Sequence, residues 1–131
     1  MEEISVHDNF VESYSVDAGK REIILHTVYR DGGANETTDI IFSDVAAYRF
    51  TGDNFQTILF DVTETTIEEV LKMNQSIFEA EKNYAWPIHY ESETDLLEKM
   101  SSQDMRAFLI HSSYGMGGWV WAKSMSKETI K

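Results

Sequence analysis

Cysteine is absent from this 131-residue sequence, and basic residues are few. Without cysteine there can be no disulfide, no thiolate nucleophile and no thiolate-containing zinc or iron–sulfur site. Lysine and arginine number 11 against 23 acidic residues, which gives a formal net charge of −12. The resulting field repels nucleic acid phosphates and anionic membranes, so we expect no direct binding to either.

Long apolar runs are also missing. No stretch approaches the roughly 18 apolar residues of a membrane span. Residues 1–4 lack the basic and apolar regions of a secretion signal, so a cytoplasmic protein is expected. Hydrophobic residues still make up 42% of the chain and aromatic residues 12%, which is too much for a disordered acidic tail. Residues 1–131 therefore predict a single folded domain that displays its carboxylates on the surface.

Both ends of the chain have the composition of β-strands. The segments rich in β-branched and aromatic residues are 10–16, 21–30, 38–50, 55–62, 105–112 and 118–123. Residues 17–20 are typical of a tight turn joining the first two segments. Ser43 and Asp44 interrupt the alternation of the third, as a β-bulge would.

Between the fourth and fifth strands the apolar period becomes helical. Thr65 and Thr66 are each followed three residues later by a glutamate, the capping-box pattern that starts a helix. One helical stripe then carries Ile67, Val70, Leu71, Ile77 and Phe78. Pro87 cannot continue this helix, and a second helix is expected from Ser92 to near Ser102.

These elements and their short connections predict the fold class. We expect an α+β domain in which an antiparallel sheet of about six strands, arranged as a meander, carries two helices packed on one face.

No motif in the sequence dictates an enzymatic reaction, and we do not expect an enzyme. Gly115, Gly117 and Gly118 precede a strand-like segment rather than the helix that a phosphate site needs, so they predict a tight hairpin with positive φ. His26 and His111 could meet beside a carboxylate, but the histidines have no compact metal-ligand spacing. We assign no catalytic, cofactor-binding or metal-binding residue.

The aromatic residues of the last strand have two interpretations. Trp119 and Trp121 share one face, opposite Val120 and Ala122. They either cap the core, the more frequent role, or form an exposed interface hot spot.

The excess of carboxylates favours a cationic protein partner, because long-range attraction raises the rate of encounter. The alternative is that the acidity serves solubility alone.

Four segments, 21–27, 39–48, 58–62 and 112–119, resemble those of small bacterial proteins, some of which are similar to immunity proteins of toxin systems. The resemblance spans most of the chain and includes no catalytic motif. It implies a protein made beside a toxic effector, often a basic nuclease, which it neutralises by covering the active site. A folded acidic surface could mimic the phosphate backbone that such a nuclease recognises, while aromatic residues supply binding energy.

We therefore expect a binding protein that neutralises a basic protein toxin, and that is itself a monomer or a weak homodimer. Its expected partner-binding residues are acids of the second half with one nearby tryptophan: Glu68, Glu69, Glu79, Trp86, Glu91, Glu93 and Asp95.

Two other functions stay open. One is a small-ligand-binding or catalytic domain with a pocket between sheet and helices, in which His26, His111 or Tyr114 would contact the ligand. The other is a structural homodimer formed through an edge strand or an aromatic face.

Overall fold

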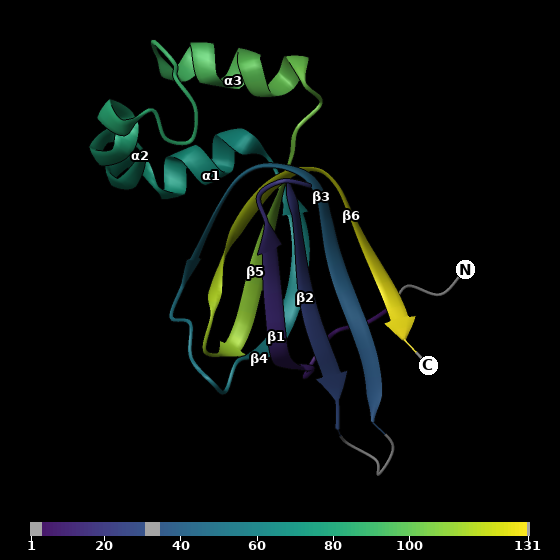
Figure 1. Cartoon of the computed structure of the whole chain (residues 1–131). Helices are drawn as coiled ribbons and strands as arrows, with labels where there is room; N and C mark the ends of the chain where they lie inside the picture. The colour runs from purple at the N-terminus through teal and green to yellow at the C-terminus, as the bar shows by residue number, and fades with distance from the viewer. Residues whose placement is uncertain (1–3, 31–34, 131) are drawn as a thin grey trace.

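The structure, a computed structural model, describes residues 4–30 and 35–130. It is an α+β fold of six antiparallel strands with a helical segment inserted between the fourth and fifth (Figure 1). The strands are β1 (Phe10–Asp17), β2 (Glu22–Tyr29), β3 (Glu36–Thr51), β4 (Ile58–Thr65), β5 (Arg106–Tyr114) and β6 (Gly117–Ile130). The helices are α1 (Ile67–Met73), α2 (Gln75–Glu81), the 3-10 helix η1 (Lys82–Tyr84) and α3 (Glu93–Ser102).

The sheet closes on itself into a six-stranded barrel. The strand order is β1-β2-β3-β6-β5-β4, and the ring is closed where Phe10 of β1 pairs with Ile58 of β4. The expected meander holds within β1 to β3 and within β4 to β6, whereas β3 pairs with β6 instead of β4.

β3 and β6 run up one side of the barrel, bend over its end and descend the other side (Figure 1). In β3 the bend follows Asp44, whose φ is 54°. The register with β6 then shifts after Val45, where Ala46 is the extra residue. The bulge thus lies just beyond the predicted position, because Ser43 still has its partner on β6. Residues 46–51 are termed the second half of β3 below.

Alternation along the strands creates an apolar core inside the barrel. On β6 the inward residues include Val120 and Ala122, both fully buried. The other buried members of this inner core are Val6, Ile23, Leu25, Ile40, Phe42, Val45, Leu59, Val62, Phe108, Ile110 and Met116.

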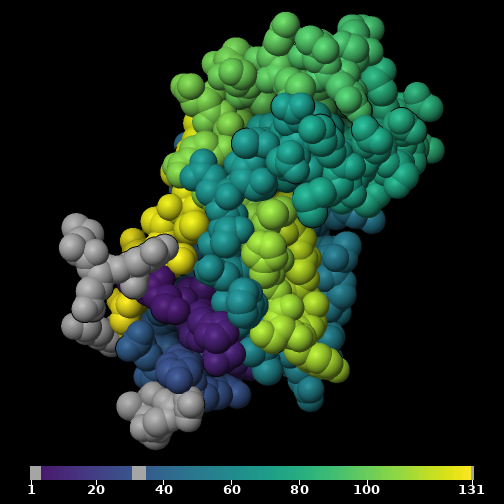
Figure 2. Space-filling view, turned by 180° about the vertical axis from the view of Figure 1, so that it is seen from behind, coloured from purple at the N-terminus to yellow at the C-terminus, as the bar shows by residue number. Residues whose placement is uncertain are grey.

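A second core lies between the barrel and residues 66–104, which we call the helical layer. This layer sits over one end of the barrel (Figures 1 and 2). The rings of Trp119 and Trp121 lie 5.7 and 5.4 Å from the ring of Phe78 on α2, in nearly parallel planes. Both tryptophans are at most 3% exposed, which confirms the core interpretation of the pair. The second core also contains Ala47, Val70, Leu71, Tyr90, Leu96, Met100 and Ala107.

Three α-helices and one 3-10 helix form where two helices were expected. The first expected helix is divided at Asn74, whose side-chain amide donates to the Val70 carbonyl at 2.8 Å and whose φ is −130°. An asparagine that bonds the backbone in this way competes with helical hydrogen bonding. Both expected starts are confirmed, at Thr66 and at Ser92. None of the helices in residues 4–30 and 35–130 has the length and apolarity required to cross a bilayer.

The glycine cluster forms the tight β5–β6 hairpin that was expected. Gly115 has a φ of 90°, and a Cβ there would lie 2.4 Å from Oγ1 of Thr57. Gly118 has a φ of 149°, and a Cβ there would lie 2.0 Å from the Arg49 carbonyl oxygen. Both positions therefore require glycine on grounds of space as well as conformation.

Replacing Thr66 with Ala tests the start of α1. The Thr66 hydroxyl accepts from the Glu69 backbone N–H at 3.1 Å, so its loss should lower the free energy of unfolding by about 1 kcal/mol. Thr66→Ser keeps the acceptor and should lose less than about half of that. Urea denaturation measures both values, and equal losses would contradict the capping role.

Candidate functional site

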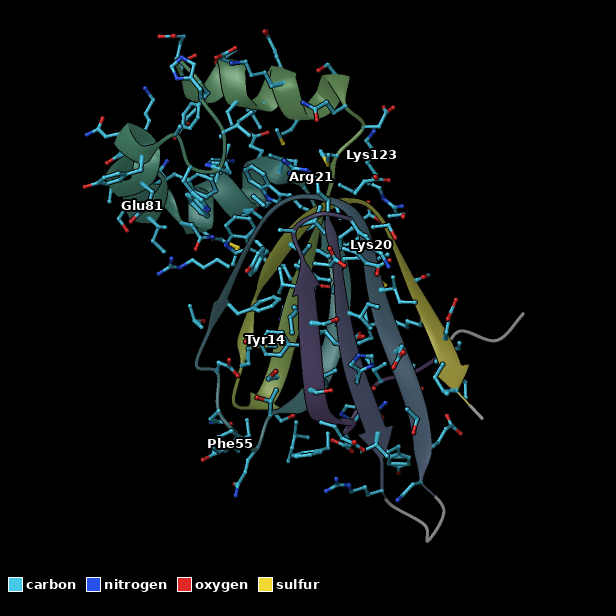
Figure 3. All side chains as sticks on the ribbon, viewed as in Figure 1. Tyr14, Lys20, Arg21, Phe55, Glu81 and Lys123 are labelled. Atoms are coloured by element: carbon cyan, nitrogen blue, oxygen red, sulfur yellow. The ribbon has the colours of Figure 1, made fainter. Side chains whose placement is uncertain are left out.

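The helical layer concentrates negative charge. Residues 66–104 contain nine acidic and three basic residues, so less than a third of the chain carries half of its net charge of −12. Within the described part of the molecule, Glu69, Glu79, Glu81 and Glu93 have no salt-bridge partner within 4 Å. Glu81 lies on the outer side of α2, away from the barrel (Figure 3). These carboxylates are therefore available to an external cation.

Glu79 and Glu93 come from different helices, and both influence the hydroxyl of Tyr90. Burial raises the pKa of the Tyr90 hydroxyl, and the negative charges of Glu93 and Glu79 raise it further. The hydroxyl donates to the Phe78 carbonyl at 3.4 Å, and the Lys82 ammonium lies 5.2 Å from the ring centre. Two of the predicted partner-binding acids therefore lie within electrostatic reach of the same buried tyrosine.

Glu91 and Asp95 form a second acidic pair at the start of α3. The Asp95 carboxylate accepts from the Glu91 backbone N–H at 2.8 Å and lies 3.2 Å from the Lys99 ammonium. These interactions, the backbone hydrogen bond first, lower the pKa of Asp95. Asp95 is therefore already engaged in structural contacts, whereas Glu91 is exposed.

The two acids of α1 also interact with their own helix. Glu68 and Glu69 lie in the first helical turn, where carboxylates interact favourably with the helix dipole. Glu68 lies 3.7 Å from the Lys72 ammonium. Both side chains are exposed.

The exposed aromatic and apolar side chains of the helical layer are not the tryptophan that was predicted from the sequence to bind a partner. Trp86 is half-buried, with its ring 5.0 Å from Phe78 and 5.8 Å from Trp119. Tyr84, two residues earlier, is 80% exposed, and Met73 is 64% exposed. Tyr84 was not selected from the sequence, because the short segment before Pro87 shows neither strand alternation nor a helical stripe that would indicate which side chains are exposed. Its place in a polar stretch, after Glu81 and Lys82, was the available signal.

A cavity of about 320 Å³ lies where the helical layer meets the barrel. Val16, Ala46, Trp86 and Pro87 line it together with Arg21, whose guanidinium donates to the Val45 carbonyl at 3.3 Å. Lys20, Arg21 and Lys123 gather near this junction (Figure 3). Cations are therefore clustered at the junction while the outer helical surface is acidic.

β1 and the second half of β3 have no backbone pairing with each other in the described residues, and two cavities open beside them. Tyr14 of β1 crosses this opening: the ring meets Phe50 edge-on at 5.4 Å, and the hydroxyl donates to Asp53, just after β3, at 2.5 Å. Figure 3 shows Tyr14 on the side of β1 that faces this half, with Phe55 below it. A side chain, rather than a backbone ladder, joins the two strands here.

The histidines considered as ligands are dispersed. His26 contacts the Asp39 carboxylate at 2.9 Å, while His111 contacts Thr63 on β4 at 3.1 Å. Neither residue, nor Tyr114, is among those that line the junction cavity. No group of three or more potential metal-ligating side chains occurs in the described ranges.

Comparison with known proteins gives no relative for this arrangement. No protein-family model, no curated protein and no solved structure matches the chain.

The Tyr14–Asp53 contact predicts a pH effect. The hydrogen bond to Asp53, followed by burial and the charge of Asp53, raises the pKa of Tyr14 from 10.0 to about 12. Because the folded-state pKa is the higher one, the stabilisation is complete below pH 10.0 and is lost as the pH rises through about 12. Absorbance titration should show one tyrosine ionising near pH 12, shifted back toward 10.0 by Asp53→Ala. An unshifted curve in that variant would exclude the contact as the cause.

Proposed function

We propose that this protein is a cytoplasmic inhibitor that binds a basic protein toxin, in the manner of an immunity protein, through its helical layer. The observation that carries the proposal is the set of exposed carboxylates without salt bridges in the helical layer, together with the exposed Tyr84 of the same layer. A nuclease that binds phosphates with lysine and arginine could pair the same side chains with these carboxylates. Occupying that surface blocks the substrate without any catalysis by the inhibitor.

Glu79 and Glu93 are the centre of the proposed interface, and Glu91, Glu68 and Glu69 extend it. Exposed carboxylates attract a cationic partner over a distance of about one Debye length, roughly 8–10 Å at physiological salt. Glu68 and Glu91 also have weak partners in the free protein, Lys72 at 3.7 Å and His89 at 3.2 Å. This attraction chiefly raises the association rate. Asp95 contributes by fixing the start of α3, since its oxygens already accept hydrogen bonds.

Tyr84 is the proposed anchor that keeps the dissociation rate of the complex low. Large aromatic side chains that become fully buried in an interface contribute the greatest share of binding energy. Trp86 lies beside it in sequence and contributes mainly by packing on Phe78 and Trp119. Association and dissociation are thus assigned to different residues.

Charge reversal tests the electrostatic part. The double variant Glu79→Lys and Glu93→Lys should slow association with a basic nuclease domain encoded beside this gene by about tenfold or more at low salt. The matched control is Glu36→Lys with Glu128→Lys, which makes the same change in net charge at exposed barrel positions. Stopped-flow kinetics and growth of cells that express the nuclease provide the two measurements. The proposal would be contradicted if association slowed equally in both double variants, or if the Glu79→Lys and Glu93→Lys variant still protected cells fully against the nuclease.

Truncation tests the aromatic anchor. Tyr84→Ala should speed dissociation of the same complex by about 30-fold or more, the effect of losing roughly 2 kcal/mol at a hot spot. Its unfolding free energy should change by less than about 0.5 kcal/mol, because the side chain is 80% exposed. Surface plasmon resonance and urea denaturation separate the two quantities. An unchanged dissociation rate would remove Tyr84 from the interface.

A second candidate function has one observation in its favour. The junction cavity falls in the size range of small-molecule sites, and Arg21 could bind an anionic ligand group there. Arg21→Ala should then abolish ligand-induced thermal stabilisation while leaving inhibition of the basic partner unchanged.

A further inference from the structure

β1 has a free backbone edge over most of its length. On that side it is tied to β4 and the preceding loop only near its start, where Phe10 pairs with Ile58 and the Val11 N–H donates to the Thr57 carbonyl at 2.9 Å. For residues 12–17 no backbone partner exists on this edge in the described ranges. Free edges of this kind pair readily with an added strand. The segment is about 20 Å long at 3.3 Å per residue.

The inward face of the same segment is only partly covered. Tyr14 pairs with Leu25 and Val16 pairs with Ile23, so each points to the same side of the sheet as a buried core residue. Yet Tyr14 is 36% exposed and Val16 is 43% exposed. Val16 is therefore only partly covered, and Tyr14 is covered on the side of Phe50 and Asp53 alone. One cavity lies beside Val16 and another beside Tyr14.

The opposite wall of this opening is the second half of β3. It pairs with β6 along one edge, and its other edge has no strand partner in the part of the chain that the structure describes. The cavity above Tyr14 has a volume of about 320 Å³, and the cavity below it about 290 Å³. We call these two cavities, together with residues 12–17 of β1 between them, the lateral groove. The contacts of Tyr14 with Phe50 and Asp53 cross the groove between the cavities, so an added strand must displace them.

The charge of the lateral groove indicates what it accepts. Its lining contains the carboxylates of Glu12, Asp17, Glu22 and Asp53 against the guanidinium of Arg21. An extended segment with basic side chains complements this balance, and apolar side chains on its other face would cover Tyr14 and Val16.

The same charges disfavour binding of a second copy of this chain in the lateral groove. In an antiparallel pairing of two β1 strands over residues 12–17, Glu12 of each copy faces Asp17 of the other. Like charges directly opposite are destabilising, and each copy also carries a net charge of −12.

We propose that the lateral groove binds an extended peptide segment in which basic and apolar residues alternate, added as a strand to the free edge of β1. The site lies outside the acidic positions Glu79 and Glu93, although Trp86 and Pro87 of the helical layer border its upper cavity. It provides main-chain hydrogen bonds for affinity and a partly exposed inner face for side-chain selection.

The test uses the full chain and a synthetic peptide of alternating Lys and Val, about eight residues long, with a Glu and Val peptide as the opposite-charge control. Fluorescence anisotropy should show binding of the Lys peptide only. Because alternate amides of a strand face the same neighbour, N-methylation of one alternate set should abolish binding, while methylation of the other set should preserve it. Hydrogen exchange of residues 12–17 should slow on binding.

Two matched variants test whether the peptide binds on the groove side of β1. Val16→Lys puts a charge into the groove and should weaken binding by about tenfold or more. Ser15→Lys makes the same charge change on the opposite, exposed face of β1 and should weaken it by less than about threefold at physiological salt. The variant Glu79→Lys with Glu93→Lys should bind the peptide like the original protein, which separates this site from the proposed inhibitory surface.

Several outcomes would overturn the proposal. These are no binding of the Lys peptide at millimolar concentration, equal binding of the Glu peptide, equal effects of the two methylation sets, and equal effects of Val16→Lys and Ser15→Lys. Concentration-dependent dimerisation abolished by Val16→Lys would assign the groove to a second copy instead.

Discussion

The stack of Phe78 on Trp119 and Trp121 is the interaction that the helical layer depends on. Its α-helices contain only 7, 7 and 10 residues, and isolated helices shorter than about 12–15 residues are marginal in water. Each large aromatic ring removes about 150–250 Å² from water, or roughly 4–6 kcal/mol at 25 cal/mol per Å². Burial against the outer face of the barrel therefore keeps these short helices in place.

This arrangement explains how so many carboxylates can be held on a small surface. Like charges on the outer side of the layer repel one another, and that repulsion opposes folding of the segment. The aromatic core beneath offsets it. A cationic partner would relieve the same repulsion on binding, so the surface that is electrostatically unfavourable in the free protein becomes favourable in a complex.

Local features were predictable because a few neighbouring residues decide them. Thr66 and Ser92 start helices through hydrogen bonds that span three residues. The glycine-rich turn was also visible locally, although Thr57 and Arg49, which exclude a side chain at Gly115 and Gly118, are distant in the sequence. Sequence alternation also placed Trp119 and Trp121 on one face, although only the structure shows that the helical layer buries it.

Features that depend on distant residues could not be read in the same way. Tyr14 and Val16 alternate like the residues of any half-buried strand, and only the missing neighbour of β1 shows that they are only partly covered. The pairing of β3 with β6 is likewise invisible to periodicity. The excess of acidic residues in this part of the chain was visible in the sequence, whereas the electrostatic influence of Glu79 and Glu93 on the same tyrosine depends on the packing of two helices.

The long ladder between β3 and β6 also determines the order in which the molecule can assemble. Thr51 pairs with Gly117 and Thr37 with Ile130, so every partner pair in this ladder is separated by at least half of the 131 residues. As the polypeptide leaves the ribosome, β3 emerges long before its partner and can pair only with β2. Contacts of such high sequence separation form slowly, because a long loop must close before they are made. The nascent chain consequently presents a long unsatisfied strand until β6 has been synthesised, and the charge it carries helps to keep that intermediate from associating with its own kind.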